Sequence, residues 1–140
     1  MAESFSDPAL DRKYKELGQA IQNFSKSLEI DLSHFKEEIE LDTIKSGQIQ
    51  KFEYSVELSW KFIKAYLKIE KGVLSQGPKD VFREFGKFNF FTSDEISNFL
   101  MIIDDRNVIA HEYKDYVMNV IHPKLKVHRN LLFKILELKL

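Results

Sequence analysis

A long apolar repeat with the period of an α-helix constrains this chain more than any other feature. The repeat runs from Leu10 to Ile39 in steps of three and four that average close to 3.6 residues. The same spacing returns between Ile44 and Leu67. No stretch alternates polar and apolar residues for long enough to indicate a strand. The sequence therefore predicts an all-α fold.

Capping residues predict where the first two helices begin and end. The first helix should start at Asp7-Pro8, because aspartate can accept a hydrogen bond from an unpaired amide and proline needs no donor there. Its repeat predicts one long helix, or two nearly collinear helices broken near Asp31–Ser33. A second helix is expected from Asp42-Thr43 to Gly72, since glycine readily takes the left-handed capping conformation.

Three further helices are expected in the second half of the chain. Pro78 should open a short helix, and Thr92 with Glu95 forms the signature of a capping box before a longer one. Asp115 should cap a last helix, which Pro123 kinks or divides. The sequence therefore predicts an up-and-down antiparallel four-helix bundle with an additional short helix. Its 140 residues fit a single domain spanning residues 1–140.

Composition excludes several kinds of chemistry. The chain has no Cys, which removes disulfides, thiolate zinc sites and cysteine nucleophiles. It also lacks a glycine-rich phosphate loop and any two His at helical spacing, so we expect neither a cofactor nor a metal. There is no apolar run of about eighteen residues and no signal-peptide pattern. We therefore expect a cytoplasmic protein that does not enter a membrane.

Charge is balanced overall but unevenly distributed. The net charge of -1 argues against a broad basic face that coats nucleic acid. Acidic residues dominate positions 29–42, whereas basic residues dominate the C-terminal stretch from Lys124 to Lys139. Both stretches are interpreted as solvated helix faces, and a local basic patch at the C-terminal one stays an alternative.

The segment from Arg106 to Tyr113 is the densest polar group on an otherwise apolar predicted helix. Asn107 and His111 are four residues apart and share a helix face, whereas Arg106 and His111 diverge by about 140°. Arg106 and His111 therefore meet only if the helix ends between them or if a second subunit completes the site.

Arg106, Asn107 and His111 around one phosphodiester would suit metal-independent RNA cleavage. His can exchange a proton near pH 7, Arg can stabilise charge on the phosphorus centre, and RNA supplies its own 2′-hydroxyl nucleophile. The alternative is structural: the segment is a helix C-terminus where Asn107 and His111 satisfy end carbonyls and Arg106 pairs with Asp104 or Asp105.

Three motifs together resemble a known family. They are Phe52-Glu53-Tyr54-Ser55-Val56-Glu57-Leu58-Ser59-Trp60-Lys61, then Pro78-Lys79-Asp80-Val81-Phe82-Arg83-Glu84, then Arg106-Asn107 with His111 and Tyr113. From about residue 47 to the C-terminus the chain is similar to the nucleotidyltransferase substrate-binding proteins, the HepT-like branch of the HEPN superfamily. The acidic stretch 29–42 is not a hallmark of that family.

The resemblance implies a helical homodimer whose partner is a separately encoded minimal nucleotidyltransferase. In toxin members of the family the positions matching Arg106, Asn107 and His111 are implicated in RNA cleavage at the dimer cleft. The tyrosine matching Tyr113 can receive nucleotidyl groups from the partner enzyme. For Glu53, Glu57 and Lys61 the resemblance gives no catalytic role. Glu57 and Lys61 have the spacing of a favourable helix pair and Trp60 is expected in the core, so we interpret the motif as a folding and dimer signature.

Three hypotheses for function follow from the sequence. The first is a companion that binds a nucleotidyltransferase and presents substrate, or itself, to that enzyme. The second is a metal-independent ribonuclease toxin that uses the Arg-x4-His motif and is silenced by modification of Tyr113. The third is a plain structural bundle in which the motif serves only to end a helix.

Overall fold

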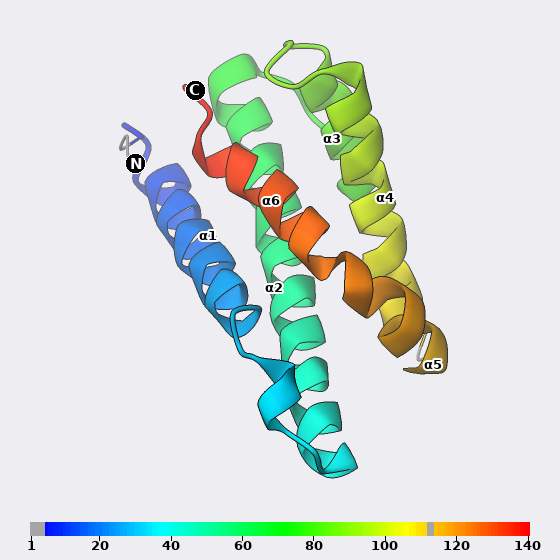
Figure 1. The fold of residues 1–140 in the computed structure, drawn as a ribbon. Coiled ribbons are helices and arrows are strands. Elements are labelled where there is room, and N and C mark those ends of the chain that lie inside the picture. The colour runs from blue at the N-terminus through cyan, green and yellow to red at the C-terminus, as the bar shows by residue number, and fades with distance from the viewer. Residues whose placement is uncertain (1–4, 112–113) are drawn as a thin grey trace.

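The computed structural model describes residues 5–111 and 114–140, and the described residues form helices without a β-strand. The elements in chain order are α1 (Pro8–Ser27), η1 (Leu32–His34), α2 (Glu38–Lys71), α3 (Pro78–Gly86), α4 (Ser93–Ala110), α5 (Lys114–Tyr116), η2 (Val117–Ile121), η3 (His122–Lys124) and α6 (Leu125–Leu136). The long helices α1, α2, α4 and α6 alternate in direction, as Figure 1 shows. The predicted all-α bundle is confirmed.

The connection between α1 and α2 differs from the prediction. The chain turns back after Ser27, so that α1 and α2 pack as an antiparallel pair (Figure 1). Asp31 Oδ1 accepts hydrogen bonds from the backbone N (3.0 Å) and hydroxyl (2.6 Å) of Ser33, which gives this segment an alternative to continued helix. One long helix, or two nearly collinear helices through Ile39, was therefore wrong. Ile39 instead lies 71% exposed in the first turn of α2.

The remaining helix ends follow the capping rules closely. The side chain of Asp7 accepts from the backbone N of Leu10 at 2.9 Å, and Gly72 ends α2 with a φ of 66°. Pro78 occupies the start of α3. Pro123 divides the last helix as predicted, because the chain passes through the π-helical turn η2 and the 3₁₀ turn η3 before α6 begins. Two helix starts differ from the prediction: α2 begins at Glu38 and not at Asp42, and Asp115 lies inside α5, which begins at Lys114, and does not cap a helix.

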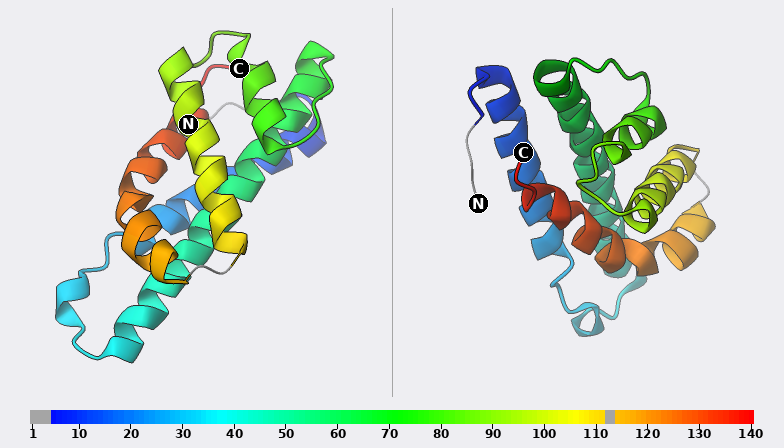
Figure 2. Two further views of the ribbon diagram at one scale, coloured as in Figure 1. Left: turned by 90° about the vertical axis from the view of Figure 1, so that its right-hand side faces the viewer. Right: turned by 90° about the horizontal axis from the view of Figure 1, so that it is seen from above.

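One apolar core joins all the long helices. α6 lies across α1 and α2, while α3 and α4 cover the C-terminal half of α2, as the views in Figure 2 show. Six phenylalanines are among the fully buried side chains: Phe24, Phe52, Phe62, Phe82, Phe85 and Phe99. Burying a large apolar side chain contributes about 1.5–3 kcal/mol, so these rings are a main source of stability. The core fixes α4 between α3 and α6.

The two ends of the bundle are formed by different parts of the chain. The start of α1 and the C-terminus lie at one end, and the acidic stretch 29–42 lies at the other, where η1 and the start of α2 project (Figure 1). None of the helices in the described ranges is long and apolar enough to cross a membrane.

Candidate functional site

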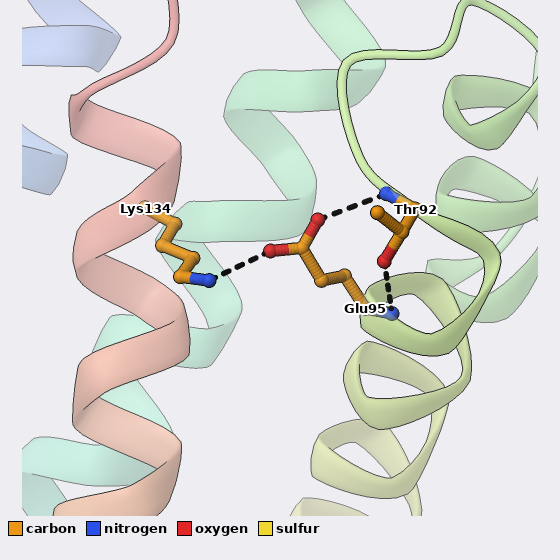
Figure 3. Close-up of polar contacts among 3 residues, drawn as sticks. All are labelled: Thr92, Glu95 and Lys134. Atoms are coloured by element: carbon orange, nitrogen blue, oxygen red, sulfur yellow. Dashed lines mark hydrogen bonds and ion pairs between the residues drawn. The ribbon is translucent and has the colours of Figure 1, made fainter.

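Helix α4 carries the predicted motif, and its starting position is set by the capping box at Thr92. Thr92 Oγ1 accepts from the backbone N of Glu95 at 3.1 Å, and Glu95 Oε1 accepts from the backbone N of Thr92 at 2.8 Å. The second oxygen of Glu95 pairs with Lys134 Nζ of α6 at 2.8 Å, as Figure 3 shows. These bonds from Lys134 and Thr92 lower the pKa of Glu95. One carboxylate therefore both caps α4 and connects it to α6.

Arg106 leaves α4 toward α2, not toward its neighbours on α4. Its nearest acidic partner is Glu57, with 3.5 Å between Arg106 Nη2 and Glu57 Oε1. Asp104 pairs instead with Lys79, and Asp105 with Lys124. The structural alternative in which Arg106 pairs with Asp104 or Asp105 was therefore wrong. The two side chains of the Arg106–Glu57 pair are 30% and 29% exposed, so the pair lies at the edge of the core.

The hydrogen bonds around Arg106 are incomplete. Trp60 Nε1 donates to Glu57 Oε2 at 2.9 Å, which leaves only the other Glu57 oxygen facing Arg106. The Nε–H of Arg106 is buried and has no acceptor in the described part of the chain. A buried donor without a partner lowers the free energy of unfolding by about 1–3 kcal/mol, so an unpaired Nε–H in the folded protein needs an explanation.

A second carboxyl group, Glu53, lies one helical turn before Glu57 on α2. Burial raises the pKa of Glu53, and the positive charge of Arg106 opposes that shift. The guanidinium of Arg106 thus faces two carboxyl groups, neither of which satisfies its Nε–H. Sequence reasoning assigned the motif that contains Glu53, Glu57 and Trp60 to folding and dimer formation. Glu57 and Trp60 are three residues apart on one helix face, which could have indicated that their side chains interact. Nothing in the sequence indicates that they meet Arg106.

Asn107 and His111 lie on the exposed side of α4. α4 ends at Ala110, and His111 is its C-terminal capping residue, with its backbone N bonded to the carbonyl of Val108 at 3.0 Å. The helix therefore ends between Arg106 and His111, one of the two conditions under which they were expected to meet. No hydrogen bond or ion pair among the described residues joins Arg106, Asn107 and His111. Tyr113, the predicted modification site, lies outside the described residues.

A second polar cluster lies on the α6 side of α4, and sequence reasoning did not identify it. Asp105 is only 7% exposed, and its Oδ2 contacts His128 Nε2 at 2.7 Å and Lys124 Nζ at 2.8 Å. The ring of His128 stacks on Phe52 with 5.4 Å between centroids. Burial lowers the pKa of His128, and the hydrogen bond and charge of Asp105 oppose it. The helical spacing of His128 with Leu125 and Leu132 could have indicated its burial.

A pocket of about 420 Å³ opens between α4 and α6 beside this cluster. Its walls combine apolar and polar side chains: Glu95, Asn98, Met101, Lys124, Val127, His128, Asn130, Leu131 and Lys134. Across residues 5–111 and 114–140, no three His, Asp or Glu side chains converge closely enough to hold a metal ion. The groups at the end of α4 that could take part in chemistry are two. They are the guanidinium of Arg106, whose Nε–H has no acceptor among the described residues, and the exposed imidazole of His111.

Comparison with known proteins agrees with this architecture. Residues 12–134 match the family described as nucleotidyltransferase substrate binding protein like. A curated relative, the "Probable ribonuclease HepT" of Haemophilus influenzae, is 29% identical over 117 residues, covering 81% of this chain and 77% of its own length.

Two solved structures share the fold. A crystal structure of a protein from Thermus thermophilus superposes with a TM-score of 0.74 at 23% identity, covering 86% of this chain and 96% of that one. A mutant of the toxin-antitoxin MntA-HpeT superposes with a TM-score of 0.67 at 17% identity, covering 91% and 94%. At these identities the likeness concerns the fold alone.

Proposed function

Because the chain belongs to the nucleotidyltransferase substrate binding protein like family, we propose that it is the helical companion of a separately encoded minimal nucleotidyltransferase. The match over residues 12–134, nearly the whole bundle, carries this proposal. The toxin-antitoxin assignment of one structural relative and the HepT name of another support a companion of the toxin-antitoxin type. In this function the bundle binds the enzyme and presents a substrate, or itself, to it.

A homodimer is part of the proposal. One large apolar side chain is exposed on α4 and one on α6 among the described residues: Met101 at 50% and Val127 at 69%. Exposed apolar groups of this kind are suited to the centre of a subunit interface. Pairing two copies along α4 would place two Arg106–His111 sets in one cleft, where the guanidinium of one copy can reach the imidazole of the other.

Tyr113 is the proposed acceptor of the partner's nucleotidyl group. In this reaction the tyrosine oxygen attacks the α-phosphorus of a nucleoside triphosphate, the bond to the β-phosphate breaks, and pyrophosphate leaves. A nucleotide two residues from His111 would add bulk and negative charge next to the motif. Such a group would repel RNA and block access to His111.

The test is coexpression of the chain with the nucleotidyltransferase encoded beside its gene. Light scattering after size exclusion should give a stable complex that contains two copies of the bundle. Labelled ATP and Mg²⁺ should transfer label to the wild-type bundle but not to Tyr113→Phe, with Tyr116→Phe as the matched control. Absence of both complex and label would overturn the companion function.

A second candidate, a metal-independent ribonuclease, is favoured by the geometry at Arg106. The partly exposed guanidinium of Arg106 can bind a phosphate oxygen, and the exposed His111 can accept the proton of a 2′-hydroxyl. The 2′-oxygen would then bond to phosphorus while the bond to the 5′-oxygen breaks and that oxygen takes up a proton. Arg106 would stabilise the negative charge that develops on the phosphorus centre.

Incubation of the purified protein with transfer RNA in EDTA tests this candidate on a gel. Wild type should cleave and His111→Ala should not, while both should bind the nucleotidyltransferase equally. His34→Ala is the matched control, because that imidazole is exposed on η1 and lies outside the motif. Intact RNA in every lane would remove the ribonuclease and leave the companion function.

A further inference from the structure

One side of α2 carries three exposed apolar side chains in a symmetric pattern. Ile39 is 71% exposed, Tyr54 58% and Ile69 44%, and these are the large apolar side chains of α2 that lie exposed. Ile39 and Ile69 are each fifteen residues from Tyr54, which places both within about 60° of it around the helix. The side of α2 opposite α6 carries no other helix of the described chain (Figure 2). The pattern is therefore the same in both directions along the helix from Tyr54.

Charged residues of α2 follow the same symmetry with opposite signs. Glu37 and Glu40 lie beside the N-terminal end of the apolar line, whereas Lys68 and Lys71 lie beside its C-terminal end. Glu40 and Lys68 are each fourteen residues from Tyr54. Glu37 and Lys71 are each seventeen residues from it. All four charged side chains are exposed, and none forms an ion pair with another residue in the described ranges.

The helix macrodipole explains only part of this charge pattern. Acidic residues in the first turn and basic residues in the last turn are each favourable to it. The exposed lysines begin earlier, however, at Lys61 and Lys64, and Lys64 already lies about two turns before the end of α2 at Lys71. Lys61, Lys64 and Lys68 follow one another at spacings of three and four, so their like charges repel. This side of α2 is therefore suited to a partner that brings negative charge and apolar groups.

From this symmetry we infer that α2 pairs in antiparallel orientation with the α2 of a second copy of the chain, with the two-fold axis at Tyr54. An isologous contact requires a surface that is complementary to itself. Ile39 of each copy then lies opposite Ile69 of the other, and the two Tyr54 rings meet at the axis. A nucleic acid would be attracted by the basic half of this surface and repelled by the acidic half. A second copy in the opposite direction matches both halves.

This pairing has a consequence for the motif on α4, which packs against α2. Glu57, the partner of Arg106, lies three residues from Tyr54, about 4.5 Å along the helix axis. The two Glu57–Arg106 pairs therefore come to the same part of the seam, one on each side of the axis. Lys51, which is exposed and also three residues from Tyr54, lies opposite Glu57 of the other copy. The inference rests on the homodimer of the proposed function and specifies the contacts that align its two copies.

Exchange of charges at one opposed pair tests the pairing. Sedimentation equilibrium of the full chain alone gives the dissociation constant of the dimer. Glu40→Lys places two lysines opposite each other at both ends of the seam, so it should weaken the dimer about tenfold. Lys68→Glu places two glutamates there and should have the same effect. The double variant Glu40→Lys/Lys68→Glu restores opposite charges and should return to within about twofold of wild type.

The matched control for the double variant is Glu40→Lys/Lys61→Glu. It makes the same change in charge, but the two altered residues do not lie opposite each other, so its dimer should stay weak.

Cross-linking tests the position of the axis. The chain has no Cys, so a single introduced thiol can form a disulfide only with another copy. Tyr54→Cys brings two thiols together at the axis, and a disulfide needs Cα atoms about 4.4–6.8 Å apart. Oxidation should therefore produce a covalent dimer on a non-reducing gel. Leu74→Cys is the control, because Leu74 is 79% exposed but follows the end of α2, so its two copies lie at opposite ends of the seam.

The outcomes separate this inference from the proposed function, since neither measurement uses a nucleotidyltransferase or RNA. A dimer equally stable in all charge variants, each shown to be folded by thermal unfolding, would overturn the α2 pairing and leave the homodimer on another surface. A wild type that stays monomeric would overturn both. Weakening in each single variant with recovery in the double variant supports the pairing, whether or not the chain binds a nucleotidyltransferase.

Discussion

Asp105 and Arg106 are adjacent in the chain but belong to two contrasting polar clusters. Asp105 points into the core, where His128 and Lys124 both bind its Oδ2. Arg106 points along α2, where its ion pair is long and one donor has no acceptor among the described residues. Successive residues on a helix diverge by about 100°, so neighbours face different helices. The completed Asp105 cluster is therefore expected to contribute more to stability than the long, partly exposed Arg106–Glu57 pair.

Removing Asp105 should have the largest effect on stability. Asp105→Ala leaves His128 without its hydrogen-bond partner in the core and Lys124 without its carboxylate. The free energy of unfolding should fall by about 3 kcal/mol, as for other buried pairs that lose one partner. Urea unfolding at pH 7 measures this, with Asp104→Ala on the exposed face as the control. If Asp105→Ala lowered the free energy of unfolding no more than Asp104→Ala does, the Asp105 cluster would not be more important for stability than an exposed ion pair.

The buried imidazole should make stability depend on pH. Burial lowers the pKa of His128 in the folded state below its ordinary value of 6.5. The unfolded chain therefore binds a proton there before the folded chain does. The stability contributed by neutral His128 is present above pH 6.5 and is lost as the pH falls from there toward the folded pKa, by at most about 1.4 kcal/mol per pH unit.

The pH effect can be isolated by comparison with His128→Gln, whose amide can still donate to Asp105. The difference in unfolding free energy between wild type and this variant should shrink as the pH falls below the ordinary histidine pKa of 6.5. Burial also lowers the pKa of His122, but that residue is present in both proteins and cancels from the difference. Parallel curves over this range would contradict a neutral, buried His128.

The N-terminal cap of α4 should contribute less than the Asp105 cluster. Thr92→Ala removes the acceptor for the backbone N of Glu95, which should lower the free energy of unfolding by about 1 kcal/mol. Thr92→Ser keeps the acceptor and is the control. Thermal and urea unfolding should both show this loss in Thr92→Ala and not in Thr92→Ser.

Arg106→Gln should have the smallest effect on stability. It breaks a long, partly exposed pair, for which about 0–1 kcal/mol is expected, and it also removes a buried donor that has no partner in the described part of the chain. Its effect should appear in phosphate binding and not in urea unfolding. If Arg106→Gln destabilised the protein as much as Asp105→Ala, the two clusters would be equally structural.

Local rules made most of the fold predictable. The apolar period and the caps at Asp7, Gly72, Pro78 and Thr92 each depend on a few neighbouring residues, so they can be read directly from the chain. The reversal after Ser27 could not be read in this way. The apolar repeat continues through it without a break in phase, and the Asp31–Ser33 hydrogen bonds that end the helix compete with that repeat over only a few residues.

The candidate site was predictable in its residues but not in its contacts. The polar segment at Arg106 and the exposed positions of Asn107 and His111 follow from α4 alone. The partners Glu57 and Trp60 lie on α2, and which face of α2 meets α4 depends on how the whole core packs. For the same reason the structural alternative offered Asp104 or Asp105 as the partner of Arg106, although Asp105 contacts His128, 23 residues further along the chain.

Two side-chain contacts between α4 and α6 restrict how far α4 can rotate. Glu95 and Asp105 are ten residues apart, about 15 Å along the helix axis, and each is tied to a side chain of α6. Two attachments on one rigid rod prevent it from rolling about its own axis. A roll of about 10° would carry a side-chain tip about 6 Å from that axis through roughly 1 Å. A displacement of that size can move a catalytic group out of its reactive alignment with a substrate. By preventing α4 from rotating, α6 therefore fixes the direction in which the Arg106 side chain points.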